Sequence, residues 1–220
     1  MELLYRPLPM PLAIAGFIGL LPLTLLAALR ALPSLLRAPA LQQHAFLAVA
    51  IGCGFLWSLQ IEASGARFSM LGAPLAALLL GRDRALLALL AALTGHLALA
   101  GGAWTNVGVL GLLLAAVPAW LMPFLQRQIE RRLPPNLFVF IIGNGLAATL
   151  ATLACMTLAL RGLAALTIAP ALQDDTLAYA LLLSWAEALV SGMIFSSLVI
   201  FIPDVVVTYR QDVYLPRGGH

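Results

Sequence analysis

Lysine is absent from the sequence, and charged residues of every kind are scarce. Only 10% of the 220 residues are charged, whereas 62% are hydrophobic and the mean hydropathy is +1.01. A soluble domain carries roughly a quarter of charged residues, so this composition excludes a charged, water-facing surface over most of the chain. The twelve basic residues are all arginine and lie in small groups between apolar runs, which argues against a nucleic-acid partner.

Cysteine and catalytic motifs are equally sparse. Cys53 and Cys155 stand alone inside apolar segments, without a CxxC pair, zinc spacing or disulfide framework, and we interpret both as small buried hydrophobes. The sequence also lacks HExxH, GxSxG and Walker A motifs and carboxylates at catalytic spacing. We therefore expect neither an enzyme nor a cofactor of its own. Transport driven by ATP would need a motor on another polypeptide.

Long apolar runs rich in leucine and alanine are what the sequence does contain. Segments that cross lipid are helices or closed barrels, and barrel strands would alternate over about ten residues, which these runs do not. The sequence thus predicts an all-α, polytopic membrane helix bundle of about seven transmembrane helices, with residues 1–220 as a single integral membrane domain in the lipid bilayer. The expected spans are 11–29, 44–61, 68–81, 85–103, 107–125, 136–160 and 177–202.

The third of these segments, 68–81, is short for a span. Fourteen residues reach about 21 Å as a helix, whereas the hydrocarbon core is about 30 Å thick. Either the helix begins earlier and takes in Glu62 and Arg67, or the segment is re-entrant and six spans remain. Glu62 and Arg67 also fit a surface ion pair, and Pro74 is expected to bend the helix.

Arginine placement predicts the orientation of the second half of the chain. Seven spans with an external N-terminus place nine arginines in the cytoplasm and three outside. Six spans with a re-entrant third segment give the same ratio, because Arg6 and Arg67 exchange sides with Arg30 and Arg37. Both arrangements put the C-terminus in the cytoplasm. The charge rule does not decide the topology of the first half. We expect a multi-pass protein of the bacterial inner membrane.

Four polar residues within or beside the spans are candidate site residues. Ionisable groups at a helix centre cost about 2.5–3.5 kcal/mol in lipid, so Glu187 in the last span is predicted to face the bundle interior or a partner subunit. It is either a proton, ion or docking site or a neutral hydrogen-bonding group. His96 is either a core histidine or a metal ligand. Asn144, between two glycines, favours an interhelical hydrogen bond, and Asn106 follows a glycine-rich hairpin.

Three stretches carry a resemblance to a known family. They are Leu71-Gly72-Ala73-Pro74-Leu75-Ala76-Ala77-Leu78-Leu79-Leu80-Gly81, the hairpin from Gly101-Gly102 to Pro118, and Glu187-Ala188-Leu189-Val190-Ser191-Gly192-Met193 followed by Pro203. In order and spacing they resemble the permeases of energy-coupling factor ABC transporters, in the cobalt and nickel (CbiM-like) branch. The resemblance covers roughly residues 60–210 and is most specific in the last stretch.

The resemblance implies a substrate-capture subunit with about seven helices and an outward N-terminus. It would work with a separate transmembrane coupling protein and cytoplasmic ATPase subunits, and its substrate would be a transition-metal ion such as cobalt or nickel. This chain departs from the family at the metal-binding motif. Metal-binding members begin with methionine and histidine, whereas this chain has Glu2, and Arg67 and Ser69 stand where the family has a second histidine. Asn106 follows the glycine pair earlier than the family asparagine does.

No metal ligand therefore carries over, and only Glu187 and Gly192 match the family pattern residue by residue. Two functions remain open. One is the substrate-capture permease of an importer, for a transition metal or for a changed substrate. The other is a membrane accessory or scaffold protein that keeps the fold without metal transport. An intramembrane enzyme is the least supported alternative, because no nucleophile and base are matched.

Overall fold

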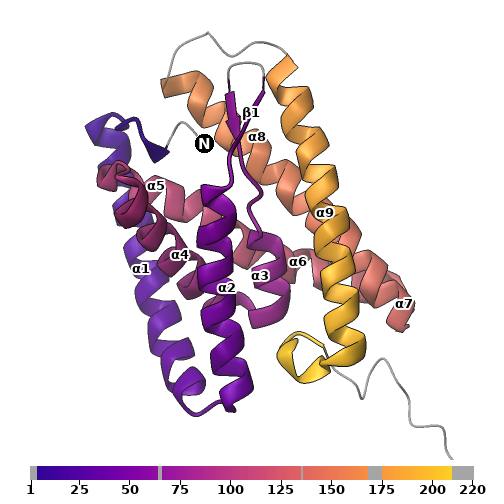
Figure 1. Ribbon diagram of the computed structural model, residues 1–220. Helices are drawn as coiled ribbons and strands as arrows, with labels where there is room; N and C mark the ends of the chain where they lie inside the picture. Colours follow the sequence, from indigo (N-terminus) through magenta and orange to yellow (C-terminus); the bar gives the residue numbers. More distant parts are fainter. Residues whose placement is uncertain (1–3, 64–65, 135, 168–174, 210–220) are drawn as a thin grey trace, which may run out of the picture.

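The computed structural model describes residues 4–63, 66–134, 136–167 and 175–209, and within these ranges it is a bundle of helices with one small hairpin (Figure 1). This confirms the all-α, polytopic fold. In chain order the elements are α1 (Met10–Leu36), α2 (Ala40–Ser58), β1 (Ile61–Ala63), β2 (Ala66–Phe68), α3 (Ala73–Leu80), α4 (Arg82–Ala100), η2 (Trp104–Asn106), α5 (Val107–Gly111), η3 (Leu112–Ala116), α6 (Val117–Arg132), α7 (Leu137–Phe140), η4 (Ile141–Ala148), α8 (Thr149–Thr167), α9 (Asp175–Phe201) and η5 (Pro203–Val205).

Six helical stretches among the described residues are long and apolar enough to cross a bilayer. Three are the single helices α1, α2 and α4, two are composite, and the last belongs to α9. The ranges are Met10–Leu36, Ala40–Ser58, Arg82–Ala100, Trp104–Arg132, Leu137–Thr167 and Leu177–Phe201. Along α1 the large side chains of Ile18 and Leu21 are exposed while Ala13 and Gly16 are buried. Small residues on the inner face and large ones outside are what lipid as a solvent favours.

The third predicted segment is not one long helix. Strands β1 and β2 pair antiparallel with Glu62 opposite Arg67, and these side chains form the expected surface ion pair, 2.8 Å from Arg67 Nε to Glu62 Oε1. Residues 69–72 then run without regular structure into α3, which has only eight residues and is about 12 Å long. The prediction that Pro74 bends a helix is wrong. Pro74 lies in the first turn of α3, where its missing N–H is tolerated.

The third segment, residues 69–81, joins the two ends of the bundle. At one end, which we call the hairpin end, Gln60 Nε2 donates to the hydroxyl of Tyr5 (3.1 Å). At the other end, the arginine end, Arg84 Nη1 donates to Gln42 Oε1 (2.9 Å) and Arg84 Nη2 to Ser34 Oγ (3.3 Å). In Figure 1 the chain passes from the hairpin through α3 toward this second end. A short helix and a non-helical stretch thus replace a full-length span.

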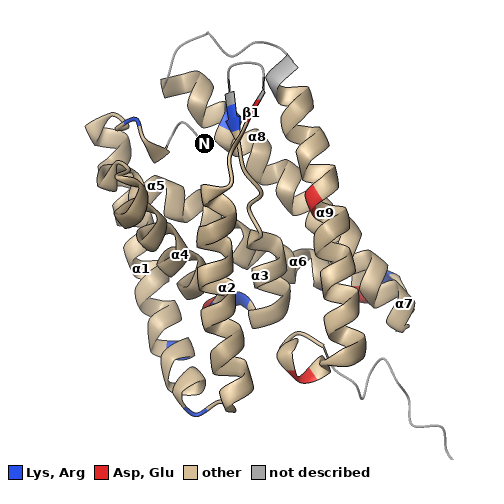
Figure 2. Cartoon of the chain, in the orientation of Figure 1, with Lys and Arg blue, Asp and Glu red and all other residues tan. Residues whose placement is uncertain are grey.

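The arginines divide between these two ends (Figure 2). Arg6 precedes α1, Arg67 lies in β2, and Arg161 lies in the last part of α8. The other described arginines lie in the last part of α1 or directly after it, in the first turn of α4, and in the second half of α6: Arg30, Arg37, Arg82, Arg84, Arg127, Arg131 and Arg132. Arg210 and Arg217 lie outside the described residues. Which end faces the cytoplasm stays a prediction from the charge rule.

The two composite helices each contain a π-helical stretch. In the first, η3 (Leu112–Ala116) directly precedes Pro118. A proline lacks the N–H and its ring would clash with the carbonyl four residues earlier, and a wider π-turn removes that clash without breaking the helix. In the second, η4 (Ile141–Ala148) contains Gly143, Asn144 and Gly145. The helices therefore continue through residues that would otherwise kink them.

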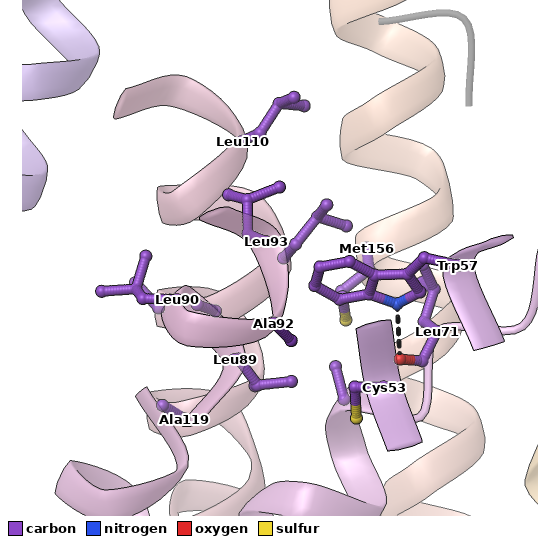
Figure 3. Packing of buried hydrophobic residues seen from close by; sticks show 14 of the residues in the cluster. Cys53, Trp57, Leu71, Leu89, Leu90, Ala92, Leu93, Leu110, Ala119 and Met156 are labelled. Atoms are coloured by element: carbon purple, nitrogen blue, oxygen red, sulfur yellow. Dashed lines mark hydrogen bonds between the residues drawn. The ribbon is translucent and has the colours of Figure 1, made fainter. Parts of the chain in front are cut away.

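Glycine-to-glycine contact joins α1 to α5. A Cβ added to Gly16 would lie 2.5 Å from the backbone nitrogen of Val109, and one added to Gly108 would clash with the backbone of Phe17. The two backbones therefore touch, as small residues permit in membrane helices. The main apolar cluster lies beside this contact and takes in residues of α2, α4, α5, α6 and α8. Figure 3 shows its part around Trp57 and Leu93.

Candidate functional site

Asn106 fixes the segment that precedes α1 against the turn between α4 and α5. Its Oδ1 accepts from the backbone N–H of Leu8 (2.9 Å), and its Nδ2 donates to the backbone oxygen of Arg6 (2.7 Å). The N–H of Ala103 donates to the oxygen of Leu4 (2.9 Å). Asn106 and Leu4 are both fully buried. The N-terminal segment, residues 4–9, is therefore anchored to the bundle by its buried Leu4 and Leu8, while its other residues are partly or fully exposed.

Gly101 and Gly102 make room for this segment. Gly101 ends α4 in the left-handed conformation, with φ of 70°, which costs glycine no steric energy. A Cβ on Gly102 would lie 2.9 Å from the oxygen of Leu4. Gly101 is thus required by its left-handed backbone and Gly102 by the close approach of the N-terminal segment, and helix periodicity predicts neither requirement.

Glu187 binds the backbone of the third segment. Its Oε2 accepts from the N–H of Leu71 (2.8 Å) and its Oε1 from the N–H of Gly72 (2.7 Å), and only 2% of the residue is exposed. Gly72 has φ of 64°, a left-handed conformation that costs glycine no steric energy and from which the chain enters α3. Because both carboxylate oxygens have partners, Glu187 holds the non-helical stretch in the bundle. The prediction that it faces the interior is confirmed.

Trp57 binds the same stretch from the opposite side. Its indole N–H donates to the oxygen of Leu71 (2.8 Å), drawn as a dashed line in Figure 3. Cys53 is buried beside Gly72, since a Cβ on Gly72 would lie 3.1 Å from its Sγ. Cys53 is thus the buried hydrophobe predicted, whereas the same prediction for Cys155 is wrong, because Cys155 is exposed on α8.

His96 is linked to this group through Trp57. The two rings pack edge to face with centroids 6.4 Å apart, and Nδ1 of His96 lies 3.3 Å from Ser58 Oγ. The Nε2 atom is buried and has no hydrogen-bond partner within the described part of the chain. Contacts therefore run from His96 through Trp57 and Leu71 to Glu187, joining α4, α2, the third segment and α9.

Asn144 stands apart from the other candidates. It is fully buried in η4, and neither its Oδ1 nor its Nδ2 has a hydrogen-bond partner among the residues that the structure describes. The interhelical hydrogen bond favoured by the sequence is absent there. The neighbouring Gly145 does serve close packing, since a Cβ on Gly192 of α9 would lie 3.2 Å from its oxygen.

The candidate site is thus the hairpin end, where the N-terminal segment and residues 69–72 enter the bundle. Asn106, Glu187 and His96 each contact one of these segments or its neighbours, and Asn144 does not. Sequence reasoning missed Trp57, whose position at the end of an apolar run fits a membrane-interface aromatic equally well. In the described ranges, 4–63, 66–134, 136–167 and 175–209, no three or more histidine, cysteine, aspartate or glutamate residues gather to hold a metal ion.

Comparison with known proteins adds one match. A family model described as the cobalt uptake substrate-specific transmembrane region, CbiM, matches residues 7–205. No curated protein and no solved structure matches the chain. The matched range runs from the N-terminal segment to η5 and so contains every candidate residue named above.

Proposed function

The chain belongs to the CbiM family, the substrate-specific transmembrane region of cobalt uptake, and from this premise we propose that it captures a transition-metal ion for an energy-coupling factor importer. The family is one of transporter membrane components and not of enzymes. The finer parts of the proposal are the metal, cobalt or nickel, and the partners, a transmembrane coupling protein and cytoplasmic ATPases. A multi-pass location in the bacterial inner membrane is also part of the proposal.

The observation that carries the proposal is the meeting of two non-helical segments inside one end of the bundle. Non-helical backbone at membrane depth is tolerated where it is buried in protein or lines a cavity, and it is there that transporters bind their substrates. Residues 4–9 are held by Asn106 and residues 69–72 by Glu187. The bond from Gln60, which precedes β1, to Tyr5 ties the N-terminal segment to the base of the hairpin that leads into residues 69–72. We place substrate capture between these two segments.

The chemistry of this end suits a borderline metal better than a hard one. Imidazole is a ligand for cobalt and nickel, and the Nε2 of His96 has no partner in the described part of the chain. Backbone oxygens of the N-terminal segment lie nearby, although those of Leu4 and Arg6 already accept hydrogen bonds. Glu187 serves by positioning residues 69–72, because both of its carboxylate oxygens are occupied by backbone N–H groups.

Cobalt uptake by intact cells tests the proposal. Cells that express the chain with its neighbouring ATPase and coupling genes should accumulate Co²⁺, and deletion of the chain should abolish the uptake. Glu187→Ala should reduce uptake at least tenfold because it releases residues 69–72, and His96→Ala should weaken the apparent affinity. Ser197→Ala is the matched control, since Ser197 is exposed on α9 and bonds only within its own helix. Uptake that survives in the deletion and in both variants contradicts metal capture.

An accessory or scaffold protein without metal transport is the second candidate. It is favoured by the sparse donor set, since the described residues contain no cluster of three metal-binding side chains. Equilibrium binding of Co²⁺ to the purified full-length chain separates the two. Capture predicts saturable binding weakened by His96→Ala, whereas a scaffold shows none. Absence of ATPase and coupling genes beside this one also favours the scaffold.

A further inference from the structure

The third segment is held at both of its ends by α9 and the residues that follow it. At the hairpin end Glu187 of α9 accepts from the N–H groups of Leu71 and Gly72. At the arginine end the chain leaves α9 and forms what we call the strap, residues 202–209. There the N–H of Val207 donates to the oxygen of Leu79 (2.9 Å), and Thr208 Oγ1 donates to the oxygen of Leu78 (2.6 Å).

These strap contacts satisfy groups that α3 cannot satisfy itself. The last carbonyls of a helix have no partner within the helix, and those of Leu78 and Leu79 belong to the last turn of α3. A helix of eight residues is too short to be stable alone, because isolated helices below about twelve residues are marginal. The position of α3 therefore depends on the packing of its buried residues, which are all but Leu75, together with what holds its two ends.

Both ends of α3 are glycines with positive φ, 64° at Gly72 and 75° at Gly81. Glycine accepts large backbone rotations at low cost, and such residues commonly serve as hinges. A Cβ added to Gly81 would meet nothing within 4 Å, so the backbone there has room to turn. The short helix is thus bounded by two pivots.

The two attachments differ in the structure that supports them. Glu187 makes two bonds, one through each side-chain oxygen, and it projects from the middle of a long helix. The strap offers one backbone N–H and one hydroxyl, both neutral, from a stretch after Pro203 that has only the short helix η5. Aromatic packing of Tyr209 on Phe140, with centroids 5.4 Å apart, adds to the strap. The strap end therefore lacks the support of a long helix that the Glu187 end has.

We propose that the strap is a latch on the third segment, and that its release lets α3 pivot about Gly72 while Glu187 keeps hold of the other end. This goes beyond the proposed function and does not depend on it. Opening moves α3 away from α6 and α9, against which Ala77 and Leu78 are now buried. The latch gives the arginine end of the bundle control over a segment whose other end lies at the candidate capture site.

Thiol labelling in native membranes tests the latch on the full-length chain. The parent carries Ala77→Cys, on buried α3, together with Cys155→Ala, and it keeps Cys53 beside Gly72 as an internal reference. Thr208→Val removes the hydroxyl donor and preserves the shape, and Thr208→Ser is the matched control that keeps the donor. N-ethylmaleimide is the probe, and mass spectrometry measures the labelling rate at each position separately.

Thr208→Val should raise the labelling rate at position 77 about fivefold, the factor that losing one ordinary hydrogen bond gives to a local opening equilibrium. The rate at Cys53 should stay constant, and Thr208→Ser should match the parent. Val207→Pro, which removes the other donor, should also raise the rate at position 77.

Three results overturn the latch: an unchanged rate at position 77 in both Thr208→Val and Val207→Pro, an equal rise in Thr208→Ser, or a parallel rise at Cys53. The last would show general loosening of the bundle. The labelling experiment uses no cobalt, so it tests the latch independently of the proposed function. Failure of the chain to take up Co²⁺ would contradict the proposed function and would leave the labelling result valid as the test of the latch.

Discussion

Two asparagines, each close to a pair of glycines, are fully buried in this bundle, but their side-chain amides differ in hydrogen bonding. Asn106 follows a turn and its amide binds Leu8 and Arg6 of the N-terminal segment. Asn144 lies in the middle of a long helical stretch, and its amide has no partner among the described residues. The same residue type thus orders one region and stays unsatisfied in the other.

The difference follows from what the surrounding backbone has left to offer. In a continuous helix the N–H and C=O groups are used within the helix, so helices that surround a buried amide present only side chains to it. Where the chain leaves the helix, as it does before α1, N–H and C=O groups become available. A buried amide, which needs both a donor and an acceptor, is satisfied in this bundle where irregular backbone enters, and the turn at Asn106 is such a place.

The largest expected effect comes from Asn106→Leu. The substitution leaves the N–H of Leu8 and the oxygen of Arg6 buried without their partner, and each such group costs about 1–3 kcal/mol. The free energy of unfolding should fall by about 4 kcal/mol, measured by denaturation in mixed micelles. The free energy of unfolding of Asn106→Asp, which keeps the acceptor for Leu8, should lie between that of Asn106→Leu and that of the unchanged chain. A loss below that of Asn144→Leu would remove the contrast between the two regions.

Glycine substitutions should sharpen the same contrast at intermediate size. Gly16→Ala places a Cβ 2.5 Å from the backbone nitrogen of Val109, which cannot move without shifting a helix. Gly145→Ala places one 2.9 Å from a ring carbon of Phe195, a side chain that can rotate. Overpacking costs about 1–3 kcal/mol. The loss of stability should therefore lie near the upper figure for Gly16→Ala and near the lower figure for Gly145→Ala. Thermal unfolding in one detergent compares them, and the reverse order would contradict the backbone contact.

Asn144→Leu should have the smallest effect on stability, and of the opposite sign. Replacing an unpartnered buried amide by an apolar group of similar shape is neutral or stabilising, so unfolding should become harder by about 1 kcal/mol or remain unchanged. The same denaturation series gives the value. A loss of stability above that of Gly145→Ala would show that the Asn144 amide is bonded in the membrane.

Apolar run length was sufficient to predict the six long helices, because lipid imposes that length directly. It also marked residues 68–81 as too short, and the cause was a hairpin and a non-helical stretch. The burial of Glu187 followed from the cost of a carboxylate in lipid. The partners of Glu187 could not be predicted in the same way. The N–H groups of Leu71 and Gly72 are available to it because α3 begins only after them, at Ala73.

The site at the hairpin end was only partly predictable for the same reason. Asn106, Glu187 and His96 stood out as polar residues among apolar ones, but the anchoring of residues 4–9 depends on contacts between distant segments. Ala103 and Leu4, for example, are joined by a backbone bond across most of the first half of the chain. That no described residue bonds the amide of Asn144 was equally hidden, since helix periodicity does not show what a side chain meets.

The enclosure of Trp57 gives the molecule a built-in optical reporter. Of the four tryptophans, Trp57 is fully buried, whereas Trp104, Trp120 and Trp185 are 54%, 36% and 52% exposed. Brominated acyl chains should therefore quench the other three and spare the indole that holds Leu71. The residual fluorescence would follow the third segment in real time, without any added dye.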